Sequence, residues 1–289
     1  MLIAPTVDDF AATIRRGSWD DFDAVYALIA TPSSNPEFLR SRWSVPSFDP
    51  ERHLWLATNG ERLVAFGALY MPNEAVVRGD PAEIPALLEH IEEQARTEDV
   101  PKLTFILPDT EEPAVRAYRD FGFDLASTVL QMELDLADPP PAPRFPEGVE
   151  VRTYTDADGR AVQQLLDDAY SAWEDAYVPM AHEDWLAFMT GDASFDPTCW
   201  WLAEADGELA GVCLTWREGW VKDLATSQTW RGRGVGKALL LHALAEHRAR
   251  GNPRAGLKVD DRNPTGAIQL YERCGFRIER RFLFLVKGL

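Results

Sequence analysis

Residues 221–251 read VKDLATSQTWRGRGVGKALLLHALAEHRARG. A β-type apolar run over 221–226 leads into the glycine-rich segment RGRGVG, and a helix with apolar periodicity over 236–250 follows at once. This succession of strand, glycine loop and helix predicts both a fold and a binding site.

The glycine loop has the composition of an anion-binding cradle. Its glycines allow the backbone to turn sharply with the N–H groups pointing inward, and the helix N-terminus adds a partial positive charge. Such a cradle suits a phosphate or a pyrophosphate. Two alternatives are a turn whose glycines only allow close packing and a dinucleotide-binding loop, although the RxxGxG spacing differs from GxGxxG. The cradle residues are Arg231, Gly232, Arg233, Gly234, Val235, Gly236 and Lys237.

The chain also contains an internal repeat. The phrase SFDP precedes an apolar hairpin twice, and each hairpin has an Asn-Gly or Asp-Gly turn. Further along each half, a helix that carries a tyrosine ends at Gly-Phe. Three matched segments in the same order indicate a duplicated domain. The matched pairs are 47–57 with 194–203, 55–70 with 201–216, and 114–123 with 267–276.

A proline-rich stretch over 137–148, ADPPPAPRFPEG, separates the two copies. Its prolines disfavour both helix interiors and sheet pairing, so we interpret it as an interdomain linker. The predicted domains are residues 1–136 and 149–289. Alternating strands and helices together with hairpins predict a mixed α+β (α/β) fold, in which each domain has a mixed, mostly antiparallel sheet with flanking helices. In the second half, the last elements expected are a helix over 264–273 and closing strands over 276–286.

The second half combines RxxGxG at 231–236 with NxxxAxxLYxxxGF at 263–276. This combination resembles the GNAT superfamily of acyl-CoA-dependent N-acetyltransferases. The resemblance covers 149–289, whereas the first half is similar only at the level of the fold. Two such domains in one chain, with an impaired first copy, are similar to the tandem, mycothiol synthase-like type of this superfamily.

The resemblance implies that acetyl-CoA (coenzyme A) is the acyl donor. The cradle would bind its pyrophosphate, and the backbone of Leu224, Ala225 and Thr226 would pair with its pantetheine arm. Asn263 and Tyr271 stand where family members contact the coenzyme. A cap at the start of the next helix, before a proline in its first turn, explains Asn263 equally well.

The same resemblance suggests catalytic groups. Tyr271 matches the position from which many members donate a proton to the departing thiolate, although Tyr118 holds the equivalent place in the first half and favours a packing role. An acceptor amine must lose a proton before attack, and Asp223 is the first candidate base. Glu174 and Asp175 come second, and each carboxylate could instead be a solvated group.

The expected activity is transfer of an acetyl group from acetyl-CoA to a primary amine of a small molecule, by direct attack in a ternary complex. The alternatives are a non-catalytic acyl-CoA-binding regulatory protein and an acetyltransferase acting on a peptide or protein N-terminus. Monomer and homodimer are both compatible with the sequence. Several tryptophans could line an acceptor pocket or build the core. They are Trp173, Trp185, Trp216 and Trp220.

The first half departs from the pattern where the cradle should stand. It reads RGDPAE over 78–83, so Asp80 and Glu83 place negative charge at the start of the helix, and Pro81 removes one donor. We therefore predict that residues 1–136 keep the fold but do not bind acetyl-CoA. Their role would be structural, or they would close the acceptor pocket.

The net charge of −18 argues against a general nucleic-acid binder and favours cationic partners, including a cationic amine, although a solvated acidic surface explains it as well. No apolar run is long enough to cross a bilayer, and no export signal precedes the first half, so we expect a cytoplasmic protein without membrane contact. The cysteines lack CxxC spacing and the five histidines lack metal-ligand spacing, so no metal is expected.

Overall fold

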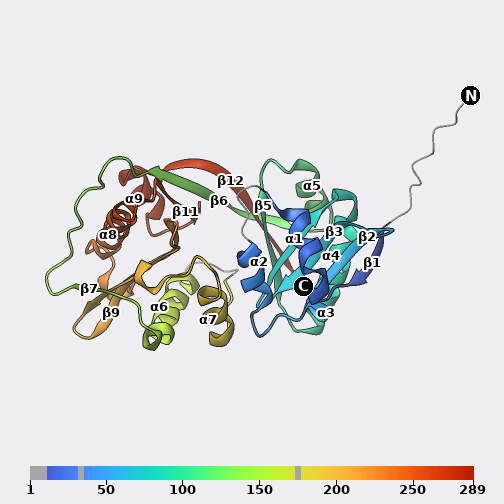
Figure 1. Cartoon of the computed structure of the whole chain (residues 1–289), viewed down its shortest axis with the longest axis horizontal. Coiled ribbons are helices and arrows are strands. Elements are labelled where there is room, and N and C mark those ends of the chain that lie inside the picture. The colour runs from blue at the N-terminus through green and yellow to red at the C-terminus, as the bar shows by residue number, and fades with distance from the viewer. Residues whose placement is uncertain (1–11, 32–35, 173–176) are drawn as a thin grey trace, which may run out of the picture.

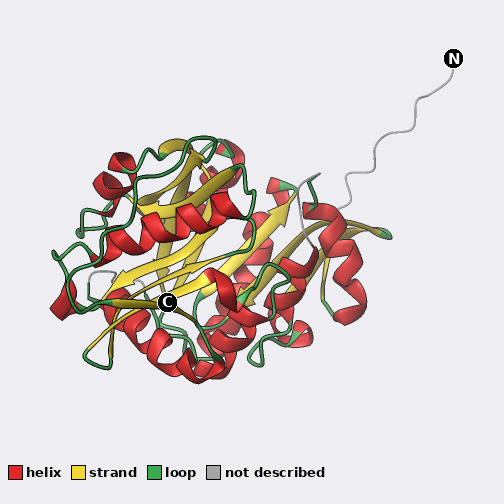
Figure 2. Ribbon diagram, turned by 60° about the vertical axis from the view of Figure 1, so that its left-hand side comes forward, coloured by secondary structure: helices red, strands yellow, loops and turns green. Residues whose placement is uncertain are grey.

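The computed structural model describes residues 12–31, 36–172 and 177–289. It contains one twelve-stranded sheet, in the order β1-β2-β3-β4-β5-β12-β6-β11-β10-β9-β8-β7. Helices cover both faces of this sheet (Figure 2). The mixed, mostly antiparallel sheet with flanking helices confirms the predicted fold class.

The twelve strands fall equally on the two sides of the 137–148 segment, which itself carries no helix or strand. Those before it are β1 (Thr13–Arg16), β2 (Leu54–Asn59), β3 (Arg62–Tyr70), β4 (Glu74–Gly79), β5 (Lys102–Pro108) and β6 (Asp124–Asp135). Those after it are β7 (Glu150–Thr153), β8 (Trp200–Ala205), β9 (Glu208–Thr215), β10 (Trp220–Thr226), β11 (Arg254–Asp260) and β12 (Arg277–Gly288).

The helices follow the same repeat. The first half has α1 (Phe22–Ile29), α2 (Pro36–Trp43), α3 (Pro50–His53), α4 (Ile84–Thr97) and α5 (Glu112–Asp120). The second half has α6 (Gly159–Ser171), α7 (His182–Thr190), α8 (Val235–Ala249) and α9 (Ala267–Arg273). The short 3-10 helices Trp19–Asp21, Pro81–Glu83 and Asp156–Asp158 lead directly into α1, α4 and α6. Two more, Pro197–Cys199 and Gln228–Trp230, precede β8 and the glycine loop before α8. Within the described ranges, no helix combines the length and the apolar composition that a membrane span requires.

The local signals of the repeat agree with the structure. In the β8–β9 turn, Asp206 and Gly207 have φ angles of 54° and 81°, which a two-residue hairpin of this kind needs. In the two SFDP phrases, the Asp49 side chain accepts a hydrogen bond from the Glu51 amide at 3.0 Å, and Asp196 accepts one from the Thr198 amide at 2.9 Å. The same aspartate-capped turn therefore leads into the first long hairpin of each half.

The halves exchange their last strands. β12 pairs with β5 of the first half, β6 pairs with β11 of the second half, and the two exchanged strands pair with each other. These long strands cross from one lobe to the other in Figure 1. From either edge inward, the sheet has five strands of one half and then the last strand of the other. The sequence repeat did not predict this exchange.

Side chains attach each exchanged strand to the half that receives it. Lys287 of β12 donates to Glu92 of α4 at 2.5 Å and to the Phe121 carbonyl at 3.1 Å. On the other strand, Ser127 of β6 donates to Asp260 of β11 at 2.5 Å. Each lobe therefore depends on the other for its complete sheet.

Four apolar clusters form the core, one on each face of the sheet in each half. In the second half, one cluster packs Leu239 and Leu244 of α8 against the sheet, and the other packs Val162 and Leu166 of α6 against the opposite face. Two corresponding clusters lie around α4 and around α1 in the first half. Burial of aliphatic side chains at about 1.5–3 kcal/mol each is the main source of stability in such a layered domain.

Strands β10 and β11 are parallel but meet at only two register positions, Trp220 with Gly256 and Val221 with Leu257. A Cβ atom at Gly256 would lie 2.6 Å from the Trp220 ring, so the ring can cross β11 there only because this residue is glycine. A bulge between Val221 and Asp223 then changes the register of β10 against β9. Beyond this point, the edge of β10 that faces β11 is unpaired.

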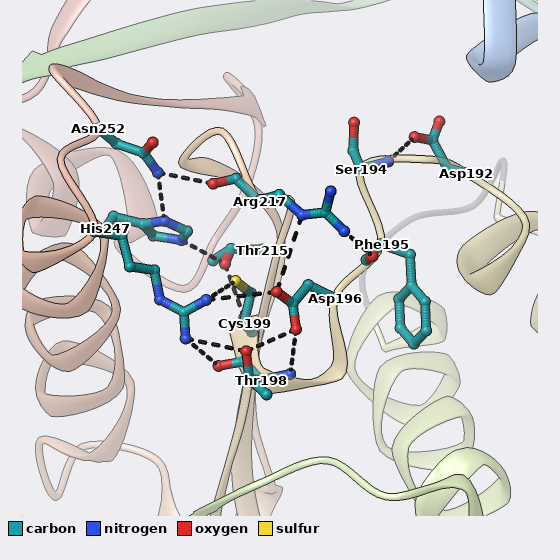
Figure 3. Close-up of polar contacts among 11 residues, drawn as sticks. Asp192, Ser194, Phe195, Asp196, Thr198, Cys199, Thr215, Arg217, His247 and Asn252 are labelled. Atoms are coloured by element: carbon teal, nitrogen blue, oxygen red, sulfur yellow. Dashed lines mark hydrogen bonds and ion pairs between the residues drawn. The ribbon is translucent and has the colours of Figure 1, made fainter.

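The far end of α8 is anchored by a buried histidine (Figure 3). His247 Nε2 lies 2.6 Å from Thr215 Oγ1, whose hydroxyl donates to the Cys199 carbonyl, so the imidazole must be the donor in this contact. On the other side of the ring, Nδ1 accepts from Asn252 at 2.9 Å, and Asn252 also donates to the Arg217 carbonyl. The network accommodates neutral histidine, and burial followed by the nearby Arg250 charge lowers the His247 pKa to about 4.

We predict that His247 makes the fold sensitive to mild acid. Because its folded pKa lies below the ordinary value of 6.5, the unfolded chain takes up the proton first, and stability present above pH 6.5 is lost as the pH falls toward 4. Between pH 7 and pH 5, the parent should lose about 2 kcal/mol more unfolding free energy than His247→Gln. Urea unfolding of both proteins at the two pH values measures this difference, and equal losses would contradict the assignment.

Candidate functional site

A cavity of ≈ 400 Å³ opens between β10, the start of α8 and α9. It lies beside the unpaired edge of β10. The structure brings nearly all of the predicted coenzyme-binding residues to its wall: Leu224, Ala225, Thr226, Arg231, Gly232, Gly234, Val235, Gly236, Lys237, Asn263 and Tyr271. We call it the cradle cavity.

The loop at one end of the cradle cavity has the backbone conformation of an anion cradle. Gly232 and Gly234 have φ angles of 75° and 91°, and nothing lies within 4 Å of a Cβ built on either residue. These glycines therefore serve the backbone conformation and not close packing. Gly234 is also the N-cap of α8, and no side chain caps this helix end. The amides of the first turn are left for an external acceptor, which fits a pyrophosphate.

Arg233 and Asn263 take positions that the sequence alone did not predict. The Arg233 guanidinium stacks 4.8 Å from the Trp230 ring centre and does not line the cradle cavity. Asn263 accepts hydrogen bonds from the amide and the hydroxyl of Thr265, and Gly266 is the N-cap of α9. The helix therefore starts at Ala267, later than the predicted 264, and Asn263 shapes the turn before it while still lining the cavity.

Tyr271 projects from α9 into the cradle cavity. Its side chain is buried, and within the described chain its phenol makes no hydrogen bond. Burial, and then the neighbouring Cys213 and Asp223, raise its pKa well above the ordinary value of 10. The phenol therefore keeps its proton at neutral pH and is free to give it to a group in the cavity.

Asp223 lies on β10, and its side chain is almost fully buried. One carboxylate oxygen accepts a hydrogen bond of 2.6 Å from the Tyr170 hydroxyl, and the other lies 3.4 Å from Lys222 Nζ. Burial, reinforced by the Asp223 charge, raises the Tyr170 pKa well above 10, so Tyr170 stays the donor. Sequence reasoning missed Tyr170, because a tyrosine on an amphipathic helix has no local signal that separates it from a core residue.

A second cavity, of ≈ 390 Å³, lies on the other side of Tyr170. Asp223 and Lys222 line it from the second half, and Asn73 and Glu74 line it from the first half. Tyr170 lines both cavities, so they meet at its ring. We call this space the interface cavity. Its remaining walls are mostly apolar: Met71, Ile106, Leu166, Val178, Met180, Trp185, Phe188, Met189 and Phe284.

The other predicted groups divide in several ways. Glu174, with Asp175 and Trp173, lies outside the described residues. Trp185 and Trp216 both belong to the core cluster around α6, and Trp185 also lines the interface cavity.

The corresponding region of the first half is closed by its own side chains. Asp80 caps the helix start by accepting from the Ala82 amide at 3.0 Å. β4 and β5 also diverge after one register pair, but Arg78 bridges the gap by donating to the Ile106 carbonyl at 3.2 Å. The Tyr118 hydroxyl donates to the Val77 carbonyl at 3.4 Å and is buried. In the first half, the helix start, the gap between the diverging strands and the tyrosine hydroxyl are therefore occupied by internal hydrogen bonds.

Known proteins share both the sequence pattern and the fold. The model of the acetyltransferase (GNAT) family matches residues 160–276. A mycothiol acetyltransferase from Streptomyces avermitilis is 30% identical over 249 residues, which cover 78% of this chain and 76% of that protein. A mycothiol acetyltransferase from Thermobispora bispora is 33% identical over 173 residues, which cover 56% of this chain and 58% of that protein.

The fold comparison agrees over nearly the whole length. A crystal structure of a GCN5-related N-acetyltransferase from Sphaerobacter thermophilus superposes with a TM-score of 0.74 at 24% sequence identity. The superposition covers 96% of this chain and 95% of the other, so the two proteins share a fold over nearly their whole length.

Proposed function

The chain belongs to the GNAT family of acetyltransferases, and we propose that it transfers an acetyl group from acetyl-CoA to a primary amine of a small molecule. The observation that carries this proposal is the junction at Tyr170. There, a cavity with an open strand edge and an anion cradle meets a second cavity that contains a buried carboxylate. Donor and acceptor could therefore be held at the same time.

The cradle cavity fits acetyl-CoA. The amides around Gly234, with Arg231 and Lys237, would hold the pyrophosphate, and the backbone of Leu224 to Thr226 would hydrogen-bond the pantetheine arm. When bound, this donor supplies an acetyl group activated as a thioester. The Thr226 carbonyl accepts a hydrogen bond of 3.4 Å from Arg231 Nε. Because β10 has no strand partner at this edge, its other amide and carbonyl groups there need such a ligand or water.

The interface cavity would hold the acceptor. Asp223 and Glu74 bring carboxylates from different halves to one space, which supports a cationic amine as the acceptor. Its apolar and aromatic walls would bind the body of a small molecule. The relatives are named mycothiol acetyltransferases, which supports a small-molecule acceptor and not a protein N-terminus.

We assign the two proton movements to separate residues. Asp223 would accept the proton of the acceptor ammonium at a carboxylate oxygen, directly or through one water, and Tyr170 would hold that carboxylate in place. Tyr271 would give its hydroxyl proton to the departing sulfur, since its phenol is protonated and unengaged. The nitrogen loses its second proton as the amide forms, and this proton would restore the Tyr271 hydroxyl. No covalent enzyme intermediate is required, which agrees with direct attack in a ternary complex.

We further propose that residues 149–289 carry the activity and that residues 1–136 do not bind acetyl-CoA. Support comes from the contacts of Asp80, Arg78 and Tyr118, which use internally the groups that a coenzyme would need. The first half would instead complete the acceptor site through Asn73 and Glu74.

We predict that Gly234→Ala weakens coenzyme A binding, and that backbone strain alone does not account for this loss. Gly207 provides a matched control, because it also has a positive φ, of 81°, and open space around its Cβ position. Each alanine should lower the unfolding free energy by about 1–2 kcal/mol. Only Gly234→Ala should weaken coenzyme A binding, by at least about tenfold, in titration calorimetry. Equal affinity in the two variants would show that the loop is not the cradle.

Substitutions test the catalytic roles of Asp223 and Tyr271, and Tyr118 of the first half provides a control. Asp223→Asn and Tyr271→Phe should each lower kcat/KM by about 10²–10⁴-fold, with coenzyme affinity little changed. Tyr118→Phe, at the equivalent position of the first half, should leave turnover unchanged. The assay follows thiol release from acetyl-CoA over a panel of primary amines. Full activity of Tyr271→Phe across pH would remove its role as proton donor.

The same assay distinguishes an enzyme from a binding module. Amine-dependent thiol release with stoichiometric acetylated product is the expected result. Tight coenzyme binding without amine-dependent release over the whole panel would favour the regulatory alternative.

A further inference from the structure

The first half contains a cavity of its own, of ≈ 460 Å³, between α1, α2 and β4. Strands from the second half close it, since Lys258 of β11 and Phe282 of β12 line one side. It adjoins the interface cavity along Glu74 and Ile106 and does not include Tyr170 or Asp223. Its volume lies in the range of about 300–1,000 Å³ that small-molecule sites occupy.

Two large apolar side chains that line this cavity are exposed to solvent. Phe38 is 48% exposed and Ile106 is 37% exposed. Within the described ranges, only five large apolar side chains are this exposed, and two of them lie here. Exposed apolar side chains that line the same cavity indicate a ligand that covers them.

Three cations line the same cavity, and two of them lack a carboxylate partner. Arg42 is compensated by Glu74 at 2.9 Å. Arg78 donates only to the backbone carbonyls of Val77 and Ile106, and Lys258 Nζ lies 4.1 Å from the Phe282 ring centre. In the described part of the chain, no carboxylate lies within ion-pair distance of Arg78 or Lys258.

This local excess of positive charge runs against the chain as a whole, whose net charge is −18. Desolvation lowers the pKa of Lys258; Glu74 raises it, and the charges of Arg78, Lys222 and Arg280 lower it further. A negative charge between Arg78 and Lys258 would relieve this repulsion.

We propose that this cavity binds a small amphipathic anion, with its charged group at Arg78 and Lys258 and its apolar body against Phe38. The charged group is a carboxylate or a phosphate, because both accept hydrogen bonds from a guanidinium and an ammonium. The site gives the first half a ligand of a different class from acetyl-CoA. It does not depend on the proposed transferase activity.

Titration calorimetry with four ligands that share one apolar body tests the proposal. We expect 4-phenylbutyrate or 4-phenylbutyl phosphate to bind at least tenfold more tightly than 4-phenylbutanol, and 4-phenylbutylamine not to bind. The preferred anion distinguishes a carboxylate source from a phosphate source. Saturation with coenzyme A should leave these affinities unchanged, because the cradle cavity and this cavity have no lining residue in common.

Substitutions of the two cations test whether the anion binds in this cavity. Lys258→Gln and Arg78→Gln should each weaken binding of the preferred anion at least tenfold, whereas Arg119→Gln, at an exposed position of α5, should not. The Lys258 side chain makes no hydrogen bond or ion pair in the described chain, so Lys258→Gln keeps the test valid if loss of the Arg78 bridge unfolds the protein. Unchanged binding in Lys258→Gln, equal binding of the alcohol, or displacement by coenzyme A would each overturn the proposal.

Discussion

The divergence of β10 from β11 is the constraint on which the rest of the structure depends. Two parallel strands in the middle of a sheet would normally pair along their length, and an unpaired buried edge costs free energy for each unsatisfied amide or carbonyl. Here the Trp220 ring crosses Gly256, the bulge follows, and pairing stops after Val221. The open edge is tolerated only where solvent or a ligand can satisfy it, and the cradle cavity lies at that place.

The first half shows the same divergence with its gap bridged by the chain's own side chains. β4 and β5 separate after one register pair, and the chain's own groups are used there. Arg78 bridges the two strands, Tyr118 of α5 donates to a carbonyl of β4, and Asp80 caps the helix start. Duplication therefore preserved the scaffold, and the two copies differ in whether these polar groups are satisfied internally. The exchange of β6 and β12 ties the copies together and lets the first half contribute walls to the interface cavity.

Much of this could be predicted from local sequence signals. The RxxGxG loop, the hairpin turns and the repeated SFDP phrases act through backbone conformation and capping, which depend on neighbouring residues. They predicted the fold class and the glycine conformation of the 231–236 loop. The strand exchange could not be predicted, because pairing β12 with β5 or with β11 requires the same alternation of side chains. Tyr170, Glu74 and the anion cavity also escaped prediction, since each depends on residues brought together only by the tertiary fold. The sequence was compatible with Asn263 as a helix cap, but Gly266 is the N-cap of α9. The Asn263 side chain instead accepts a hydrogen bond from the Thr265 amide in the turn before the helix.

The central claim is that only one of the two scaffolds in this chain receives a coenzyme. Titration calorimetry with coenzyme A counts the sites directly. One site per chain is the result that the open β10 edge and the closed first half predict, whereas two equivalent sites per chain would contradict the account.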